Sequence, residues 1–134
     1  SESGYLLTTT SVVKEDPARN FVHIDSGLNH LIRPMMYGSY HHILNLSNPD
    51  GPEKTYNVVG YICETDTFAS DRNLPEVRQG DVLAFLNAGA YGLTMSSNYN
   101  ARFRPAEVLV DNGEAKLIRR RETMDDLLRT QIDL

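Results

Sequence analysis

The sequence predicts a mainly β domain, a Greek-key-like β-barrel or sandwich with a short C-terminal helix. Three observations favour this class. Short runs rich in β-branched and aromatic residues alternate with turn-forming residues along most of the chain. An Asn-Gly pair, Asn112-Gly113, separates two apolar runs, which is the strongest short-range signal for a β-hairpin. Helical spacing appears only near the end, where Met124, Leu127 and Leu128 recur on one face.

The elements follow one another with recognisable turns between them. The turn residues EDPARN follow the first strand, and the loop SNPDGPEK, with two prolines and a glycine, precedes the fourth. Residues 71–79 read as polar and irregular. Thr123 suits the N-cap of the helix, with Asp126 in the capping-box position. The expected strands are Tyr5–Lys14, Phe21–Ile24, Tyr40–Leu46, Tyr56–Cys63, Val82–Leu86, Glu107–Val110 and Glu114–Arg119, and the expected helix is Thr123–Gln131.

Length and charge narrow the classes of protein. The 134 residues fit one domain, and 40% apolar residues suffice for a core. A net charge of −5 argues against a general nucleic-acid binder, and the basic run Arg119–Arg121 reads as a solvated strand end or helix approach. No stretch approaches the roughly 18 apolar residues of a membrane helix, and no secretory leader opens the chain.

Cysteine, serine and histidine side chains can catalyse reactions or bind metals, but the sequence around most of them here shows no such motif. The single cysteine, Cys63, cannot form an internal disulfide, so nothing suggests an oxidising compartment; it is either a buried strand residue or a working thiol. The serines Ser96 and Ser97 lack a nucleophile-elbow setting. The histidines have no convincing metal-ligand spacing and are interpreted as structural or surface residues: His23, His30, His41 and His42.

Four blocks of sequence narrow the function. They are DSGLNHLIRPMMYGSYH, VVGYICETDTFASDRNLP, GDVLAFLNAGAYGLTMSSNYNARFRPAEVLV and RRRETMDDLLRTQ. In their order and spacing they resemble the C-terminal domain of diaminopimelate decarboxylases, pyridoxal-phosphate-dependent enzymes of the alanine racemase-like fold. The resemblance runs from about Gly4 to Gln131.

The resemblance implies that residues 1–134 are the β-domain of a two-domain enzyme whose N-terminal (β/α)₈ barrel is absent from this chain. That barrel carries the lysine that binds pyridoxal 5'-phosphate covalently; the lysines here, Lys14, Lys54 and Lys116, sit in no such motif. The implied enzyme is a cytoplasmic homodimer with shared active sites that converts meso-diaminopimelate to L-lysine and carbon dioxide. The isolated chain is expected to be inactive.

The resemblance also implies roles for single residues. Arg33 and Tyr37 would bind the substrate's distal carboxylate, and Tyr91 would contact the cofactor phosphate and the substrate. Cys63 would supply a proton in the partner's active site, where Glu64 would bind the distal ammonium. Gly89 and Gly92, which flank Ala90-Tyr91, predict a close backbone approach there. Asp66 is shifted from the position of the family's usual aspartate, and the resemblance assigns it no role.

Two alternatives stay open at this point. One is a related pyridoxal-phosphate-dependent decarboxylase of the same architecture, acting on ornithine, arginine or carboxynorspermidine. The other is a non-catalytic regulatory or binding module that kept the β-domain and lost the chemistry. Intact contact residues favour an enzyme. Glu64 after Cys63, and Arg33 with Tyr37, favour a substrate that bears both a distal ammonium and a distal carboxylate.

Overall fold

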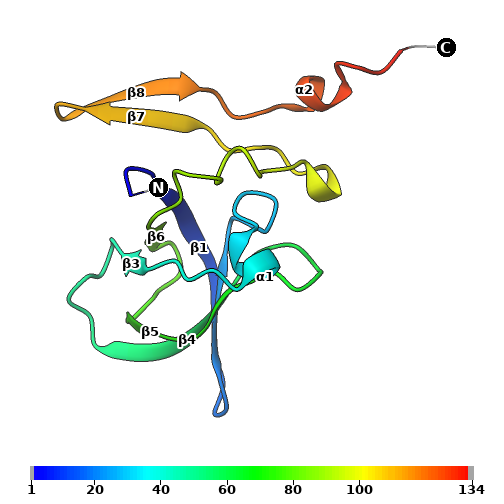
Figure 1. Cartoon of the computed structure of the whole chain (residues 1–134). Coiled ribbons are helices and arrows are strands. Elements are labelled where there is room, and N and C mark those ends of the chain that lie inside the picture. The colour runs from blue at the N-terminus through cyan, green and yellow to red at the C-terminus, as the bar shows by residue number, and fades with distance from the viewer. Residues whose placement is uncertain (1, 133–134) are drawn as a thin grey trace. The chain divides into compact units, whose positions relative to one another are not determined.

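The computed structural model describes residues 2–132, and the chain divides into two compact units, one ending at Ser96 and one starting at Ser97. The first unit is built on a six-stranded sheet and one short helix (Figure 1). A mainly β fold is therefore confirmed. The elements of this unit are β1 (Leu6–Glu15), β2 (Asn20–Ile24), α1 (Arg33–Tyr37), β3 (Ile43–Asn45), β4 (Glu53–Val59), β5 (Thr67–Pro75) and β6 (Val82–Phe85).

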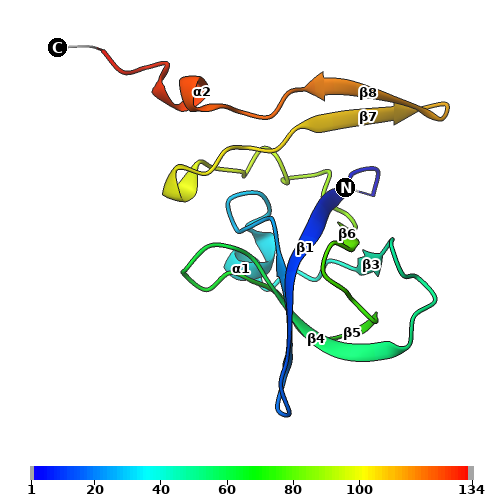
Figure 2. The same ribbon diagram turned by 180° about the vertical axis from the view of Figure 1, so that it is seen from behind.

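The sheet has the strand order β3-β6-β1-β2-β4-β5 and curls toward a barrel (Figure 2). Neighbouring strands are antiparallel except β2 and β4, which run parallel with Val22 opposite Val58. At the two edges, the Asn45 side chain at the end of β3 donates a hydrogen bond of 3.0 Å to the Glu76 carbonyl just after β5. The edge strands thus approach each other at this end of the sheet.

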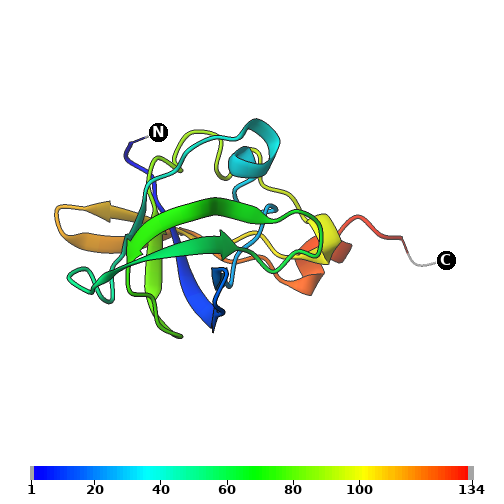
Figure 3. The same ribbon diagram turned by 90° about the horizontal axis from the view of Figure 1, so that it is seen from below.

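The core of the first unit consists of inward-facing residues from nearly every strand. Phe68 of β5 and Phe85 of β6 pack with ring centroids 5.1 Å apart, and Tyr56 is completely buried. The Tyr56 hydroxyl accepts a hydrogen bond from the Val77 amide at 3.1 Å, so its burial leaves no polar atom unsatisfied. Strands β4 and β5 lie side by side around this core (Figure 3).

The second unit contains the hairpin of β7 (Glu107–Asp111) and β8 (Glu114–Arg119), the 3₁₀ turn η1 (Tyr99–Ala101) and the helix α2 (Met124–Leu128). The Asn112-Gly113 turn has positive φ at both residues, 49° and 81°, as the sequence predicts. The Glu122 carboxylate organises the chain before the helix: it accepts hydrogen bonds from the Asn98 side chain at 2.6 Å and the Arg104 amide at 2.8 Å.

The basic run is a solvated strand end, as the sequence indicates. Arg119 closes β8 and pairs with Glu107 at 2.6 Å across the hairpin. Arg120 grips both carboxylate oxygens of Asp126 at 2.6 and 2.8 Å. The same Asp126 completes the predicted capping box by accepting the Thr123 amide at 2.8 Å. These charges are therefore used within the unit, close to where they stand in the sequence.

Several local features differ from the predictions. The predicted strand Tyr40–Leu46 is shorter, because β3 covers only Ile43–Asn45. The predicted strand Tyr56–Cys63 ends at Val59, because Gly60 leaves the ladder and turns the chain into a loop. The segment 71–79, predicted irregular, is strand β5 as far as Pro75; its polar side chains face outward at an edge, where hydrophobic alternation is weak. The helix Arg33–Tyr37 is not predicted at all, because five residues carry no helical periodicity.

The Asp81 carboxyl makes the stability of the first unit depend on pH. Burial alone would raise the pKa of this carboxyl, but hydrogen bonds from Asn45 and the Arg78 amide, with the Arg78 charge, hold it below the ordinary 3.8. A lowered pKa stabilises the fold at pH values above the unfolded-state pKa, and this contribution is lost as the pH falls through the folded-state pKa.

We therefore expect Asp81→Asn to lower the free energy of unfolding by about 1–3 kcal/mol at neutral pH. The difference between wild type and variant should shrink as the pH falls below about 4. Urea unfolding followed by circular dichroism at several pH values measures both. A difference that stayed constant down to pH values well below the ordinary carboxyl pKa would contradict the assigned role of this carboxylate.

Candidate functional site

Helix α1 places two of the predicted site residues on one face. Its sequence suits one short turn, since Pro34 has a fixed φ that fits the start of a helix and Gly38 adopts φ 63° at its end. The Gly38 amide donates to the Pro34 carbonyl at 3.0 Å and closes the helix. Arg33 and Tyr37, four positions apart, therefore point the same way.

Tyr91 reaches the same place from a distant part of the chain. It lies in the loop after β6, has a positive φ of 65° and leaves 58% of its surface exposed. The flanking glycines are needed for close backbone approach, as predicted: a side chain at Gly92 would collide with the Ala88 carbonyl, and Gly89 packs directly on Gly4. This loop is thus pressed tightly against the chain, with the phenol pointing outward.

The guanidinium of Arg33 lies between the two phenols. Its Cζ is 5.5 Å from the ring centroid of Tyr37 and 5.1 Å from that of Tyr91. Such cation–π contacts hold a guanidinium in place while its N–H groups stay available for a ligand. Within residues 2–132, no carboxylate lies within ion-pair distance of Arg33. A half-buried cation beside two exposed phenols, with no counter-charge among the described residues, is suited to an external carboxylate or phosphate.

Cys63 and Glu64 lie on a different element, the loop between β4 and β5. Both are exposed, so the reading of Cys63 as a buried strand residue is excluded. The thiol donates a hydrogen bond to the Glu64 carboxylate, with Sγ 3.4 Å from Oε2. The thiol and the carboxylate are therefore accessible to a second molecule.

Asp66 is the functional candidate that sequence reasoning missed. Its buried carboxylate accepts the Leu28 amide at 2.7 Å and the Ile62 amide at 2.8 Å, and so joins two loops. Burial raises the pKa of this carboxyl, more than the two backbone hydrogen bonds lower it, and the nearby Glu64 charge adds to the rise. The available signal was Gly60, a glycine inside a predicted strand, which marks a close approach of backbone to another group.

Around Asp66, the same two loops share a buried polar network. The Tyr61 amide donates to the Ser26 carbonyl at 3.1 Å, and its hydroxyl donates to the Asn29 side chain at 3.1 Å. His30 lies 2.9 Å from the Ser26 hydroxyl and edge-on to the Tyr61 ring. One of these loops leads into α1 with Arg33, and the other carries Cys63. The network therefore connects the two groups of predicted site residues through the fold.

The other chemistry-bearing side chains are used locally. His30 belongs to the network just described, and His41 points its Nδ1 at the Leu86 carbonyl, 2.8 Å away. Among residues 2–132, no three His, Cys, Asp or Glu side chains gather as metal ligands would. Lys54 bridges Glu15 and Glu76, at 3.0 and 2.7 Å, and both partners raise its pKa.

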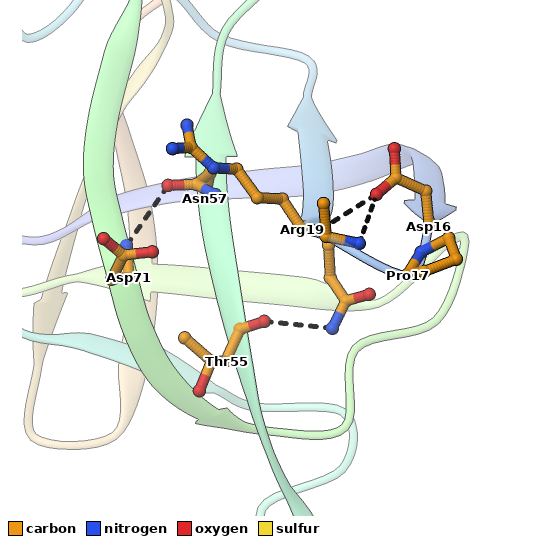
Figure 4. Close-up of a pocket in the computed structure, with 8 residues that line it drawn as sticks. Asp16, Pro17, Arg19, Thr55, Asn57 and Asp71 are labelled. Atoms are coloured by element: carbon orange, nitrogen blue, oxygen red, sulfur yellow. Dashed lines mark hydrogen bonds between the residues drawn. The ribbon is translucent and has the colours of Figure 1, made fainter.

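A small polar pocket of about 150 Å³ lies beside the β1–β2 turn (Figure 4). Its side chains bind nearby backbone groups: Asp16 accepts the Arg19 backbone amide at 2.9 Å, and the Asn20 side chain donates to the Thr55 carbonyl at 3.1 Å. None of the predicted site residues lines it. The pocket is therefore a product of turn chemistry.

Comparison with known proteins identifies the family. Residues 1–89, more than half of the chain, match the model of the family described as pyridoxal-dependent decarboxylase, C-terminal sheet domain. The chain belongs to this family. The match includes α1, the loop of Cys63 and Glu64, and Asp66, and it ends just before Tyr91. In the described part of this pyridoxal-dependent decarboxylase domain, no helix is long and apolar enough to cross a membrane.

Individual relatives of this pyridoxal-dependent decarboxylase domain are diaminopimelate decarboxylases. The chain is 54% identical to that of Methanothermobacter thermautotrophicus over 132 residues, and 45% identical to that of Aquifex aeolicus over 133 residues. These matches cover 97% and 98% of the chain. A crystal structure of the Methanocaldococcus jannaschii diaminopimelate decarboxylase in complex with L-lysine superposes with a TM-score of 0.92, at 43% identity and over 99% of the chain.

The chain spans about a third of these relatives. It covers 31% and 32% of the two sequences and 31% of the crystallised chain. About two thirds of each relative therefore lie outside the part compared.

Proposed function

We propose that the full-length protein is a diaminopimelate decarboxylase, which converts meso-diaminopimelate to L-lysine and carbon dioxide, and that this chain is its C-terminal β-domain. The observation that carries the proposal is the Arg33 guanidinium held between two exposed phenols, in a chain about half identical to diaminopimelate decarboxylases over nearly its whole length. An amino-acid substrate with a carboxylate at its far end needs such a cation.

Arg33 would bind the distal carboxylate of the substrate. A guanidinium offers two parallel N–H donors to a carboxylate, and the Tyr37 phenol adds a third donor on the same helix face. Since both rings already contact the guanidinium, little side-chain entropy remains to be lost on binding. A substrate such as ornithine or arginine has no carboxylate at the end far from the reacting carbon, so Arg33 would be the residue that selects diaminopimelate.

Cys63 and Glu64 would act in the active site of a second subunit. Their loop is exposed, and the thiol would supply a proton to the carbon that loses carbon dioxide. The Glu64 carboxylate would bind the distal ammonium. Each active site would then be built from Arg33, Tyr37 and Tyr91 of one subunit and Cys63 and Glu64 of its partner, in a homodimer of two-fold symmetry.

Pyridoxal phosphate fits this domain at Tyr91 only in part. An exposed phenol on a backbone pressed close by glycines can donate to a phosphate oxygen. The lysines do not fit a covalent anchor: Lys54 is held by two carboxylates and Lys116 pairs with Glu114. When bound, the cofactor serves as the electron sink for decarboxylation, and we propose that the missing barrel domain holds it.

Two measurements test this proposal. The full-length protein should form L-lysine and carbon dioxide from meso-diaminopimelate, and should prefer this substrate to ornithine and arginine, which lack a distal carboxylate. The isolated chain should neither turn over substrate nor show a saturable absorbance band when titrated with pyridoxal phosphate. Preference for ornithine or arginine would assign the protein to another decarboxylase, and a full-length protein without any turnover would point to a regulatory module.

A further inference from the structure

We propose that Asp66 is a positioning residue that fixes the Cys63–Glu64 pair for its role in the partner's active site. The inference rests on the proposed function for what Cys63 and Glu64 do, but its geometry belongs to this chain alone. The carboxylate clamps the loop that carries the pair onto the loop that leads into α1.

Each oxygen of the Asp66 carboxylate accepts a backbone amide from a different loop. Oδ1 accepts Leu28 at 2.7 Å, from the loop between β2 and α1, and Oδ2 accepts Ile62 at 2.8 Å, from the β4–β5 loop. The Asp66 carbonyl also accepts the Gly60 amide at 2.8 Å, which closes the β4–β5 loop on itself. One residue thus provides three hydrogen bonds to the backbone around the site.

The space around this carboxylate is too narrow for a different side chain. Asp66 is 5% exposed. A Cβ at Gly60 would collide with Oδ2, and one at Gly27 would lie 3.0 Å from it, so both positions need glycine. An Asn in place of Asp66 would turn its amide hydrogens toward one of the two N–H donors, and a Glu would need room for a further methylene group.

The clamp determines where Cys63 and Glu64 stand. Ile62 and Asp66 are both buried, at 6% and 5% exposure, and only the three exposed residues 63–65 lie between them. A span of three residues held at both ends has few conformations, so the thiol and the carboxylate are fixed before any ligand arrives. Without the clamp the pair must be ordered on binding, at a cost in rate.

Other contacts between the same loops should keep a variant at Asp66 folded. Tyr61 donates from its amide to Ser26 and from its hydroxyl to Asn29, both at 3.1 Å. Loss of the carboxylate is therefore expected to loosen the segment 62–66 while the sheet and the loop before α1 persist.

The test compares full-length Asp66→Ala and Asp66→Asn with wild type. Asp81→Asn serves as the matched control, because Asp81 is also a buried carboxylate that accepts a backbone amide, that of Arg78. Two readouts are measured: kcat and KM for meso-diaminopimelate, and the rate at which iodoacetamide alkylates Cys63 without substrate, followed on the Cys63 peptide by mass spectrometry. Amide hydrogen exchange of Leu28 and Ile62 is measured in wild type.

We expect Asp66→Ala to lower kcat/KM by about 10- to 100-fold, the usual cost of a small misplacement of reacting groups. Alkylation of Cys63 should become several-fold faster, Asp66→Asn should lie between wild type and Asp66→Ala, and Asp81→Asn should alter neither readout. The amides of Leu28 and Ile62 should be protected from exchange in wild type.

Unprotected amides in wild type, or a folded Asp66→Ala with unchanged kcat/KM and alkylation, would overturn the inference. Equal changes in Asp81→Asn would show that the effect is general destabilisation, and this result would also overturn the inference. Should the wild-type protein not decarboxylate meso-diaminopimelate, the proposed function fails, while exchange and alkylation still decide the role of Asp66.

Discussion

Arg33→Ala in the full-length protein is expected to lower kcat/KM for meso-diaminopimelate by more than any other single change on helix α1. Removal of one partner of a charged, hydrogen-bonded pair costs about 2–5 kcal/mol, which corresponds to roughly 30- to several-thousand-fold. The fold should persist, since Arg33 has no ion pair within the described chain and its ring partners are mostly exposed. Steady-state kinetics measure the loss.

One variant separates the role of the paired N–H donors of the guanidinium from that of its charge, and a second serves as a control. Arg33→Lys keeps the charge but loses the paired donors, so it should recover only part of the activity. Arg19→Ala removes an arginine beside the β1–β2 turn, in the polar pocket, and should leave the kinetics unchanged. Residual turnover of a substrate without a distal carboxylate should be nearly insensitive to Arg33→Ala. An equal loss for both substrates would contradict the assigned role.

Cys63→Ala is the second change with a large expected effect, because it would remove the proton donor itself, and loss of general acid catalysis costs about 100- to 10,000-fold. The proposed location of Cys63 in the partner's site makes a stronger test possible. In a dimer with one Arg33→Ala and one Cys63→Ala subunit, one site carries both defects and the other carries none.

Random pairing of the two inactive variants should therefore restore about a quarter of the wild-type activity, since half of the dimers are mixed and each has one intact site of two. Co-expression with two different affinity tags isolates the mixed dimer, whose activity should be half that of wild type. Mixing Arg33→Ala with Tyr37→Ala is the control, because both defects lie on one helix and no intact site can form. Mixed dimers without activity would place Cys63 and Arg33 of one subunit in the same site.

Local sequence signals were sufficient to predict elements that depend on residues only a few positions apart. The turn at Asn112-Gly113 needs two residues that tolerate positive φ, and the capping box at Thr123 and Asp126 needs two side chains three positions apart. Both elements form as predicted, although α2 ends earlier, at Leu128. Strand β1 also agrees within a residue, because its Leu, Thr and Val content is that of a pleated, half-buried surface.

Elements that depend on contacts between distant residues could not be predicted from the local sequence. Strand β5 has polar residues at an edge and is held by pairing with β4. Residues 71–75 by themselves carry no signal of that pairing. Helix α1 is one turn long and owes its form to Pro34 and Gly38. The end of β4 at Val59 depends on Gly60, where the Asp66 carboxylate and the Ser26 carbonyl leave no room for a side chain.

The identity of the family could be read from short blocks of residues, because a match of residue types over four blocks in one order and spacing does not arise by chance. Which of those side chains meet was decided by the folded chain alone. Arg33 and Tyr91 are 58 positions apart in the sequence, and Asp66 closes a contact with Leu28 across two strands. Such contacts depend on how the sheet curls and on which loops it brings to the same end, and these follow from packing of the whole core.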